Sequence, residues 1–283
     1  MAEISAADVK KLREKTGAGM MECKNALVSC EGNFEKAEKL LKEKGLAAIG
    51  KRADRATNEG KVTIKIRGDT AVLAELASET DFVARNPEFI ALGEAIAAAA
   101  LDKGFSEPAD ELNAMVTDLA TKIRENMSLK RIKTVKAGPD EYLTSYNHND
   151  GNIGVVVRVG AEKPGVFDGQ EVKDFVFTLA LHIAAFNPLA LDQSKIDSAY
   201  IKEQEEIFAK QMEQDEKNKG KPANILENIL KGKVKKHLQD ICLLDQDYVK
   251  DPSIKVSQAL ADFNKKTGAG ISVKEYVYFR VGE

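Results

Sequence analysis

The sequence predicts an α+β protein, in which runs of strands and runs of helices follow one another instead of alternating strictly. Three observations lead to this fold class. Apolar residues recur at helical spacing through residues 1–45 and again in several later segments. Apolar and polar residues alternate between about residues 60 and 77 and near the end of the chain, as in strands with one buried face. Strands followed by amphipathic helices occur twice, at about 60–140 and at 141–283.

The length and composition limit the class of protein. With 283 residues, the chain is long enough for two or three packed units. Its 42 Lys and Arg residues nearly balance 45 Asp and Glu residues, which disfavours a binder of nucleic acid, because such proteins concentrate positive charge. Three cysteines favour a reducing compartment, so we expect a cytoplasmic protein. We expect no membrane anchoring, because the most apolar stretch, residues 95–101, is far below the about 20 residues that span a bilayer.

Residues 1–45 carry three short helix patterns with well-formed ends. In the first, we expect Ser5 to cap the helix and Gly17 to end it. The second covers about residues 20–30. Asn33 should cap the third, which is expected to end before Gly45. A unit this small buries little surface and would be only marginally stable alone.

A domain boundary is predicted at the charged segment 51–55, which we interpret as a helical tether. Beyond it, alternating residues predict a hairpin that turns at Gly68. One helix should begin after Asn86, and a second should follow around 112–123. Further strands are expected at about 129–136, 142–147 and 153–159.

The composition changes after a further helix that ends near Asn187. Residues 195–238 are highly charged and carry two narrow apolar stripes, separated by a turn that contains Gly220 and Pro222. Each stripe is wide enough to bury only the seam that faces the other helix, so we predict an antiparallel coiled-coil hairpin. A final helix and a strand with apolar residues on one face complete the chain.

The sequence contains no recognisable motif for catalysis, for a metal or for a cofactor. The sequence Lys-Thr-Gly-Ala-Gly occurs at 15–19 and at 266–270, but neither copy has the spacing of a phosphate-binding loop, and both fit helix ends. His148, His182 and His237 lie far apart without metal-ligand spacing, and a core position is favoured for His182. We therefore expect a protein that is not an enzyme and that uses no cofactor or metal.

Two segments depart from a purely structural pattern. Consecutive methionines, Met20 and Met21, begin a helix, and because both cannot face one small core, we expect one to be exposed for protein binding. The other segment places Phe82 beside Asp81 in a connection between a strand and a helix. The residues alone leave alternatives open: the methionines could fill the core, Thr80 could be only a cap, and Phe82 could fold back onto the protein.

At these two segments the sequence closely resembles the elongation factor Ts family. The resemblance covers essentially the whole chain in order, and its first two motifs are specific. The residues that carry it are Leu12-Arg13-Glu14, Thr16-Gly17-Ala18-Gly19-Met20-Met21 with Cys23-Lys24, Glu79-Thr80-Asp81-Phe82-Val83-Ala84, Lys122-Ile123-Arg124-Glu125-Asn126, Ser145-Tyr146-Asn147-His148, and His182-Ile183-Ala184-Ala185 with Pro188.

The resemblance implies a domain organisation. It implies a three-helix module like a ubiquitin-associated domain in residues 1–54, a core N-subdomain in 55–140 and a core C-subdomain in 141–283, both with small antiparallel sheets. It also implies a coiled-coil hairpin inserted at about 190–238, through which a homodimer can form. Some family members continue into a further helical module, so we expect one partner contact to be missing in this chain.

The resemblance also implies guanine-nucleotide exchange on a partner GTPase, elongation factor Tu. The three-helix module would grip the nucleotide domain of the partner, and the connector would act at the magnesium end of its nucleotide site, with the phenylalanine as a wedge. Arg124 stands where the family commonly has glycine. The partner-binding residues that the resemblance indicates are Arg13, Met20, Met21, Lys24, Thr80, Asp81, Phe82, Val83 and His148.

Two other functions are open on the sequence. A scaffold or adaptor would use the three-helix module to bind proteins without changing nucleotide affinity. An RNA binder would use the basic part of the hairpin, although the lysines of 231–236 fit a solvated helix face better. Release of a labelled GDP from the partner would distinguish the three functions, because only an exchange factor accelerates it.

Overall fold

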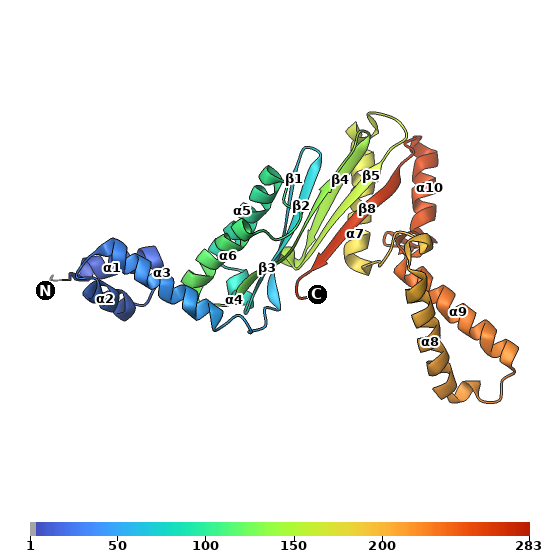
Figure 1. The fold of residues 1–283 in the computed structure, drawn as a ribbon. Helices are drawn as coiled ribbons and strands as arrows, with labels where there is room; N and C mark the ends of the chain where they lie inside the picture. The colour runs from blue at the N-terminus through green and yellow to red at the C-terminus, as the bar shows by residue number, and fades with distance from the viewer. Residues whose placement is uncertain (1–3) are drawn as a thin grey trace. The chain divides into compact units, whose positions relative to one another are not determined.

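The computed structural model describes residues 4–283, except for the side chains of residues 47 and 48. The described chain has the predicted α+β architecture, with helices and small sheets in separate runs (Figure 1). It divides into two compact units. The first contains the chain up to Lys136 with Asn147–Gly154 and Phe279–Glu283, and the second contains Ala137–Tyr146 and Val155–Tyr278. The three-part division that the resemblance implies stays a prediction.

The chain begins with a module of three helices, α1 (Ala6–Thr16), α2 (Met20–Ser29) and α3 (Phe34–Gly50). The predicted cap residues are confirmed at the ends of α1: the Ser5 side chain accepts a backbone N–H of the first turn, and Gly17 ends the helix at a left-handed φ of 67°. The helices share a small core of Val9, Leu12, Ala18, Cys23, Ala26, Leu27, Ala37 and Leu41.

The third helix differs from the prediction, because α3 continues through Gly45 to Gly50. The glycine at position 45 permits close packing and does not end the helix: a Cβ there would lie 2.2 Å from the Cγ2 of Thr121 in α6 (Asp110–Ile123), against which α3 packs. Segment 51–55 forms turns and a bend. The predicted helix end at Gly45 and the predicted helical tether are therefore both wrong.

The first unit also contains a three-stranded antiparallel sheet in the order β1-β2-β3. The predicted hairpin consists of β1 (Glu59–Arg67) and β2 (Thr70–Ser78), and β3 (Met127–Lys136) pairs with the other edge of β2. Between β2 and β3 come α4 (Asp81–Ala84), α5 (Pro87–Lys103) and α6. The helix α5 packs on β1 and β2, and the helix α6 packs on β3. The short helix α4 begins three residues after the end of the buried central strand β2.

A second three-stranded sheet has the order β4-β5-β8, with β4 (Glu141–His148), β5 (Ile153–Gly160) and β8 (Ser272–Arg280). Two helices of the second unit, α7 (Gln170–Phe186) and α10 (Val256–Thr267), are joined by a ring stack between Phe175 and Phe263, whose centroids are 4.1 Å apart. The short elements are β6 (Asp247–Tyr248), β7 (Asp251–Lys255), and the 3-10 turns η1 (Asn149–Gly151), η2 (Val166–Asp168), η3 (Gln193–Lys195), η4 (Glu216–Asn218) and η5 (Leu243–Asp245).

Two helices occupy the region for which a hairpin is predicted. They are α8 (Ser198–Gln214) and α9 (Ala223–Ile241), which pack against each other within the second unit (Figure 1). The connection contains Gly220 at a left-handed φ of 79°. The coiled-coil packing of the seam and the homodimer stay predictions. Within the described residues, none of the helices is long and apolar enough to cross a membrane.

His182 is a core residue with satisfied hydrogen bonds, as predicted. Its side chain is fully buried in α7, and its Nδ1 accepts the backbone N–H of Val249 at 3.2 Å. The Nε2 therefore carries the proton and donates to the Oε1 of Gln246 at 2.9 Å. Burial lowers the pKa of His182, so a neutral ring fits this position.

Candidate functional site

The short helix α4 presents one aromatic ring to solvent. Phe82 is 82% exposed, the largest exposed fraction among the large apolar side chains of the described residues. Its neighbour Val83 is 7% exposed and belongs to the core between the first sheet and α5 and α6. Because a helix of four residues can bury only one side, the same turn that anchors Val83 directs Phe82 outward. The ring does not fold back onto the protein.

Thr80 is tied down by several hydrogen bonds, so it is more than a helix cap. Its Oγ1 accepts the backbone N–H of Val83 at 3.4 Å, which caps α4. The same Oγ1 donates to the Oε1 of Glu125 at 2.8 Å, and the Thr80 backbone N–H donates to the other carboxylate oxygen at 3.1 Å. The Oγ of Ser78 donates to the Thr80 carbonyl oxygen at 3.0 Å. Two bonds to a charged acceptor hold the turn in one geometry.

A second carboxylate makes the complementary contact. Glu79 lies beside Thr80, and its Oε1 accepts the backbone N–H of Asn126 at 2.6 Å. The other carboxylate oxygen of Glu79, Oε2, forms an ion pair with Arg55 at 3.2 Å. The pKa of Glu79 lies below its ordinary value, chiefly because of the N–H from Asn126 and then because of Arg55. The segment after β2 and the loop after α6 are thus joined in both directions: Glu79 accepts from the backbone of the loop, and Glu125 in the loop accepts from Thr80. We call Glu79, Thr80, Glu125 and Asn126 with their hydrogen bonds the Thr80 clamp.

Sequence reasoning missed the roles of Glu79 and Glu125. Both residues lie in segments that carry the family resemblance, but the bond between Thr80 and Glu125 joins residues 45 positions apart. No periodicity or cap pattern relates such residues, because the pairing follows from how α6 packs beside β2. The only signal in the sequence was that Glu125 lies next to the predicted end of a helix.

Asp81 stands at the first position of α4, where a carboxylate is favoured by the positive end of the helix. It forms an exposed ion pair with Arg85 at 3.2 Å. An exposed pair of this kind contributes little to stability, so Asp81 remains available to exchange Arg85 for another partner. A direct contact between Asp81 and a partner protein stays a prediction.

The three-helix module presents apolar side chains at the start of α2. Met20 is 44% exposed and Met21 is 64% exposed, so the structure exposes both methionines where the sequence led us to expect one. Met21, Lys24 and Val28 follow one another at spacings of three and four, which places them on one face of α2. Val28 is 55% exposed and was not predicted as a contact. The opposite face contributes to the small core.

Arg13 and His148 are the remaining predicted contacts, and both are exposed. Arg13 lies on α1, apart from the Thr80 clamp. His148 ends β4 beside the η1 turn, which is tied to β1 by an ion pair of 2.7 Å between Lys61 and Asp150. Lys61 lowers the pKa of Asp150, and Arg85 adds a smaller effect of the same sign. The turn after His148 therefore lies within electrostatic reach of α4.

A metal ion requires a particular arrangement of acidic, histidine and cysteine side chains. In the part of the chain that the structure describes, no group of three or more of them is arranged to hold an ion. The exposed ring on its clamped turn and the exposed face of α2 have the chemistry of protein contact surfaces.

Comparisons with known proteins identify the family of the chain. A family model described as Elongation factor TS matches residues 79–283. The chain is 51% identical over 280 residues to Elongation factor Ts of Treponema denticola, with 99% of each chain covered. It is 39% identical over 297 residues to that of Clostridium acetobutylicum, covering 99% of this chain and 93% of the relative. It is 38% identical over 283 residues to that of Borreliella burgdorferi, covering all of both chains. These matches show that the chain belongs to the elongation factor Ts family, whose members act in translation elongation.

Proposed function

We propose that this chain accelerates the release of GDP from elongation factor Tu by disturbing the magnesium and phosphate site of that GTPase. The observation that carries the proposal is the ring of Phe82, which is 82% exposed on a turn that the Thr80 clamp fixes. An apolar ring held in water has no packing role in its own chain, whereas it gains free energy when it enters an apolar site of a partner. The protein makes and breaks no covalent bond in this function.

The chemistry of magnesium explains why a small displacement is enough. Mg²⁺ requires a near-ideal octahedral shell of oxygen ligands at short distances, and it tolerates little distortion. A ring inserted between the elements that carry these ligands would shift them and weaken the hold on the phosphates. The wedge has to be stiffer than the site that it enters, because a mobile turn would yield first. The carboxylate contacts of Glu79 and Glu125 support this part of the proposal, because they restrain the turn that carries the ring.

The three-helix module supplies a second contact in the proposal. Met20, Met21 and Lys24 expose flexible thioethers and one charge on the first turns of α2, and Arg13 adds a charge from α1. Binding by this surface would hold the wedge at a high effective concentration near its target, because both belong to one chain. His148, beside the turn that is tied to β1, is proposed as a further contact.

The proposal requires reciprocity between the factor and GDP. If the factor weakens GDP binding, GDP weakens binding of the factor by the same ratio. A typical coupling free energy of about 1–3 kcal/mol corresponds to about 5- to 150-fold in affinity. GDP should therefore displace this protein from elongation factor Tu. The ratio by which GDP weakens binding of the protein should equal the ratio by which the protein weakens binding of GDP.

The test is the release of a fluorescent GDP from preloaded elongation factor Tu, chased by unlabelled GDP. We expect substoichiometric amounts of the protein to accelerate release. An adaptor would bind the GTPase without changing the release rate, and an RNA binder would not bind it at all. Ile225→Ala provides a control, because it truncates an exposed apolar side chain on α9 that is not among the proposed contacts. An unchanged release rate with the wild-type chain would overturn the proposal.

A further inference from the structure

We propose that Arg124 is a positioning residue that joins the three-helix module to the Thr80 clamp, so that the two contact surfaces act as one body; this rests on the proposed function. The residues that form the connection are Glu22 in α2, Arg124 at the end of α6, and Glu125, which follows it in the chain. The family resemblance assigns Arg124 no role and indicates glycine at its position.

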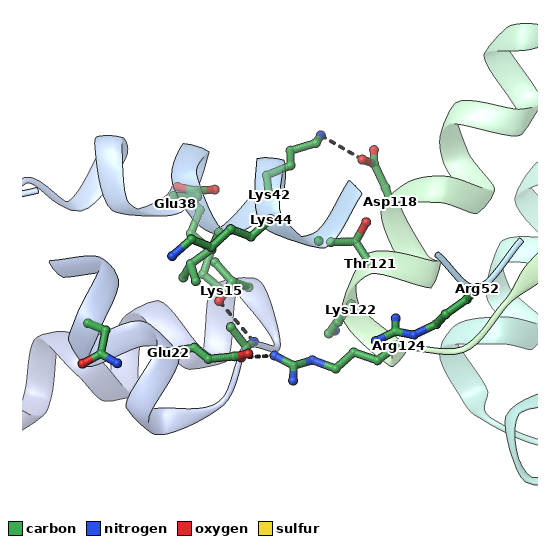
Figure 2. Close-up of a pocket in the computed structure, with 15 residues that line it drawn as sticks. Lys15, Glu22, Glu38, Lys42, Lys44, Arg52, Asp118, Thr121, Lys122 and Arg124 are labelled. Carbon is green, nitrogen blue, oxygen red and sulfur yellow. Dashed lines mark hydrogen bonds and ion pairs between the residues drawn. The ribbon is translucent and has the colours of Figure 1, made fainter. Parts of the chain in front are cut away.

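One end of the connection is fixed in the first turn of α2. Glu22 is the third residue of this helix, directly after Met20 and Met21, and its Oε2 accepts the backbone N–H of Gly19 at 2.9 Å. The same oxygen accepts a hydrogen bond from the Arg124 guanidinium (Figure 2). The pKa of Glu22 is lowered, first by the bond from Arg124 and then by the Gly19 N–H. The exposed methionines and the ion pair therefore share one helical turn.

The other end is fixed in the backbone. Arg124 ends α6 at a left-handed φ of 68°, and its N–H donates to the carbonyl oxygen of Ala120 at 2.8 Å. A side chain other than glycine is strained in this conformation. The next residue, Glu125, accepts both hydrogen bonds from Thr80. A displacement of the Arg124 backbone also shifts Glu125, because a trans peptide unit holds adjacent Cα atoms about 3.8 Å apart.

The packing between the module and α6 is close enough to transmit such a displacement. A Cβ on Gly17 would lie 2.6 Å from the Cγ of Lys122, and Lys42 pairs with Asp118 at 2.8 Å. These contacts border a cavity of about 370 Å³ between the module and α6, and the pair of Glu22 and Arg124 crosses one of its edges (Figure 2). The module and α6 thus meet at several points around the cavity.

The inference is tested first in the free protein, without the GTPase. Amide hydrogen exchange resolved by NMR reports the clamp through the backbone N–H groups of Thr80 and Val83, which it holds. We expect Glu22→Gln to lower their protection, although glutamine keeps the bond to Gly19. The expected change is about twofold to fivefold, the range over which an exposed ion pair shifts an equilibrium. Glu227→Gln, which removes an exposed ion pair in α9, should leave both amides unchanged.

Variants of Arg124 separate positioning from stability. We expect Arg124→Gly to lower protection as Glu22→Gln does, while its melting temperature stays equal to or rises above that of the wild type, because glycine adopts this φ without strain. Arg124→Lys keeps a cation opposite Glu22 and should restore most of the protection. Unchanged protection in both Arg124→Gly and Glu22→Gln would overturn the inference, and so would an equal loss in Arg124→Lys and Arg124→Gly.

The GDP-release assay links the connection to function. We expect Arg124→Gly and Glu22→Gln each to slow release by no more than about fivefold, with no further loss in the double variant, because both remove the same link. Additive losses in the double variant would contradict a shared link. If the wild-type chain fails to accelerate GDP release, the proposed function is wrong. The amide hydrogen-exchange data on the free protein would still decide whether the module and the clamp are connected.

Discussion

Two phenylalanines seven positions apart should lose very different amounts of stability on truncation. Phe82 is 82% exposed, so Phe82→Ala removes less than a fifth of the burial that a phenylalanine can contribute. Complete burial contributes about 1.5–3 kcal/mol, so the expected loss of unfolding free energy is about 0.3–0.5 kcal/mol. Phe89 is 1% exposed in the core between the first sheet and α5, and Phe89→Ala should cost about 3–5 kcal/mol.

Urea denaturation of the two single variants beside the wild type measures these losses. The comparison is valid where the slope of free energy against urea stays the same, because the midpoint then reports stability. Phe89→Ala serves as the matched control, since it removes the same atoms from a buried position on α5. A loss above about 1.5 kcal/mol for Phe82→Ala would mean that the ring packs within its own chain, and the reasoning that makes it a wedge would be refuted.

Three further predictions follow from individual contacts. Gly45→Ala should loosen the three-helix module from α6 and increase its proteolysis, whereas Gly50→Ala, where an added Cβ meets nothing within 4 Å, should leave proteolysis unchanged. The folded-state pKa of Glu79 lies below its ordinary value of 4.5. The stability that Glu79 contributes is therefore complete above pH 4.5 and is lost as the pH falls through the folded-state pKa. Thermal unfolding between about pH 7 and 3 should show a weaker pH dependence in Glu79→Gln. Burial raises the pKa of the Cys242 thiol to about 11, so little thiolate is present near neutral pH. Mass spectrometry after alkylation should therefore find label on the partly exposed Cys30 long before it finds label on Cys242. Early labelling of Cys242 would contradict the packing.

Features that depend on a few neighbouring residues could be predicted from the sequence. The cap at Ser5, the left-handed end at Gly17 and the start of α5 after Asn86 are local, because each forms a hydrogen bond with a backbone group no more than four residues away. The first hairpin was also predictable, since its register follows from alternation and from a short turn at Gly68.

Features that depend on tertiary packing could not be predicted. Gly45 has the local appearance of a helix end, yet it lies within α3. A glycine is needed there because Thr121 of α6 occupies the space that a side chain would take. The Thr80 clamp could not be predicted for the same reason, because the acceptor Glu125 comes from a distant part of the chain. The exposure of Phe82 was predicted only with the help of the family resemblance, because the residues alone favoured a ring that folds back.

The Thr80 clamp explains how an exposed side chain can be stiff. Exposed rings on ordinary loops sample several rotamers and backbone states, and ordering them on binding costs free energy. Here Glu125 and Glu79 fix the backbone that precedes α4, and the buried side chain of Val83 anchors α4 in the core. Most of the ordering cost is thus met when the protein folds, before any partner is bound.

The maximal rate of GDP release from elongation factor Tu, measured with increasing amounts of Phe82→Ala, tests the central claim most directly. If the ring acts as a wedge at the magnesium site, the variant should reach a maximal rate at least about tenfold below that of the wild type, which corresponds to about 1.4 kcal/mol in the activation free energy of GDP release. Its half-saturating concentration should change less, because the three-helix module still binds. A maximal rate equal to that of the wild type would contradict the account.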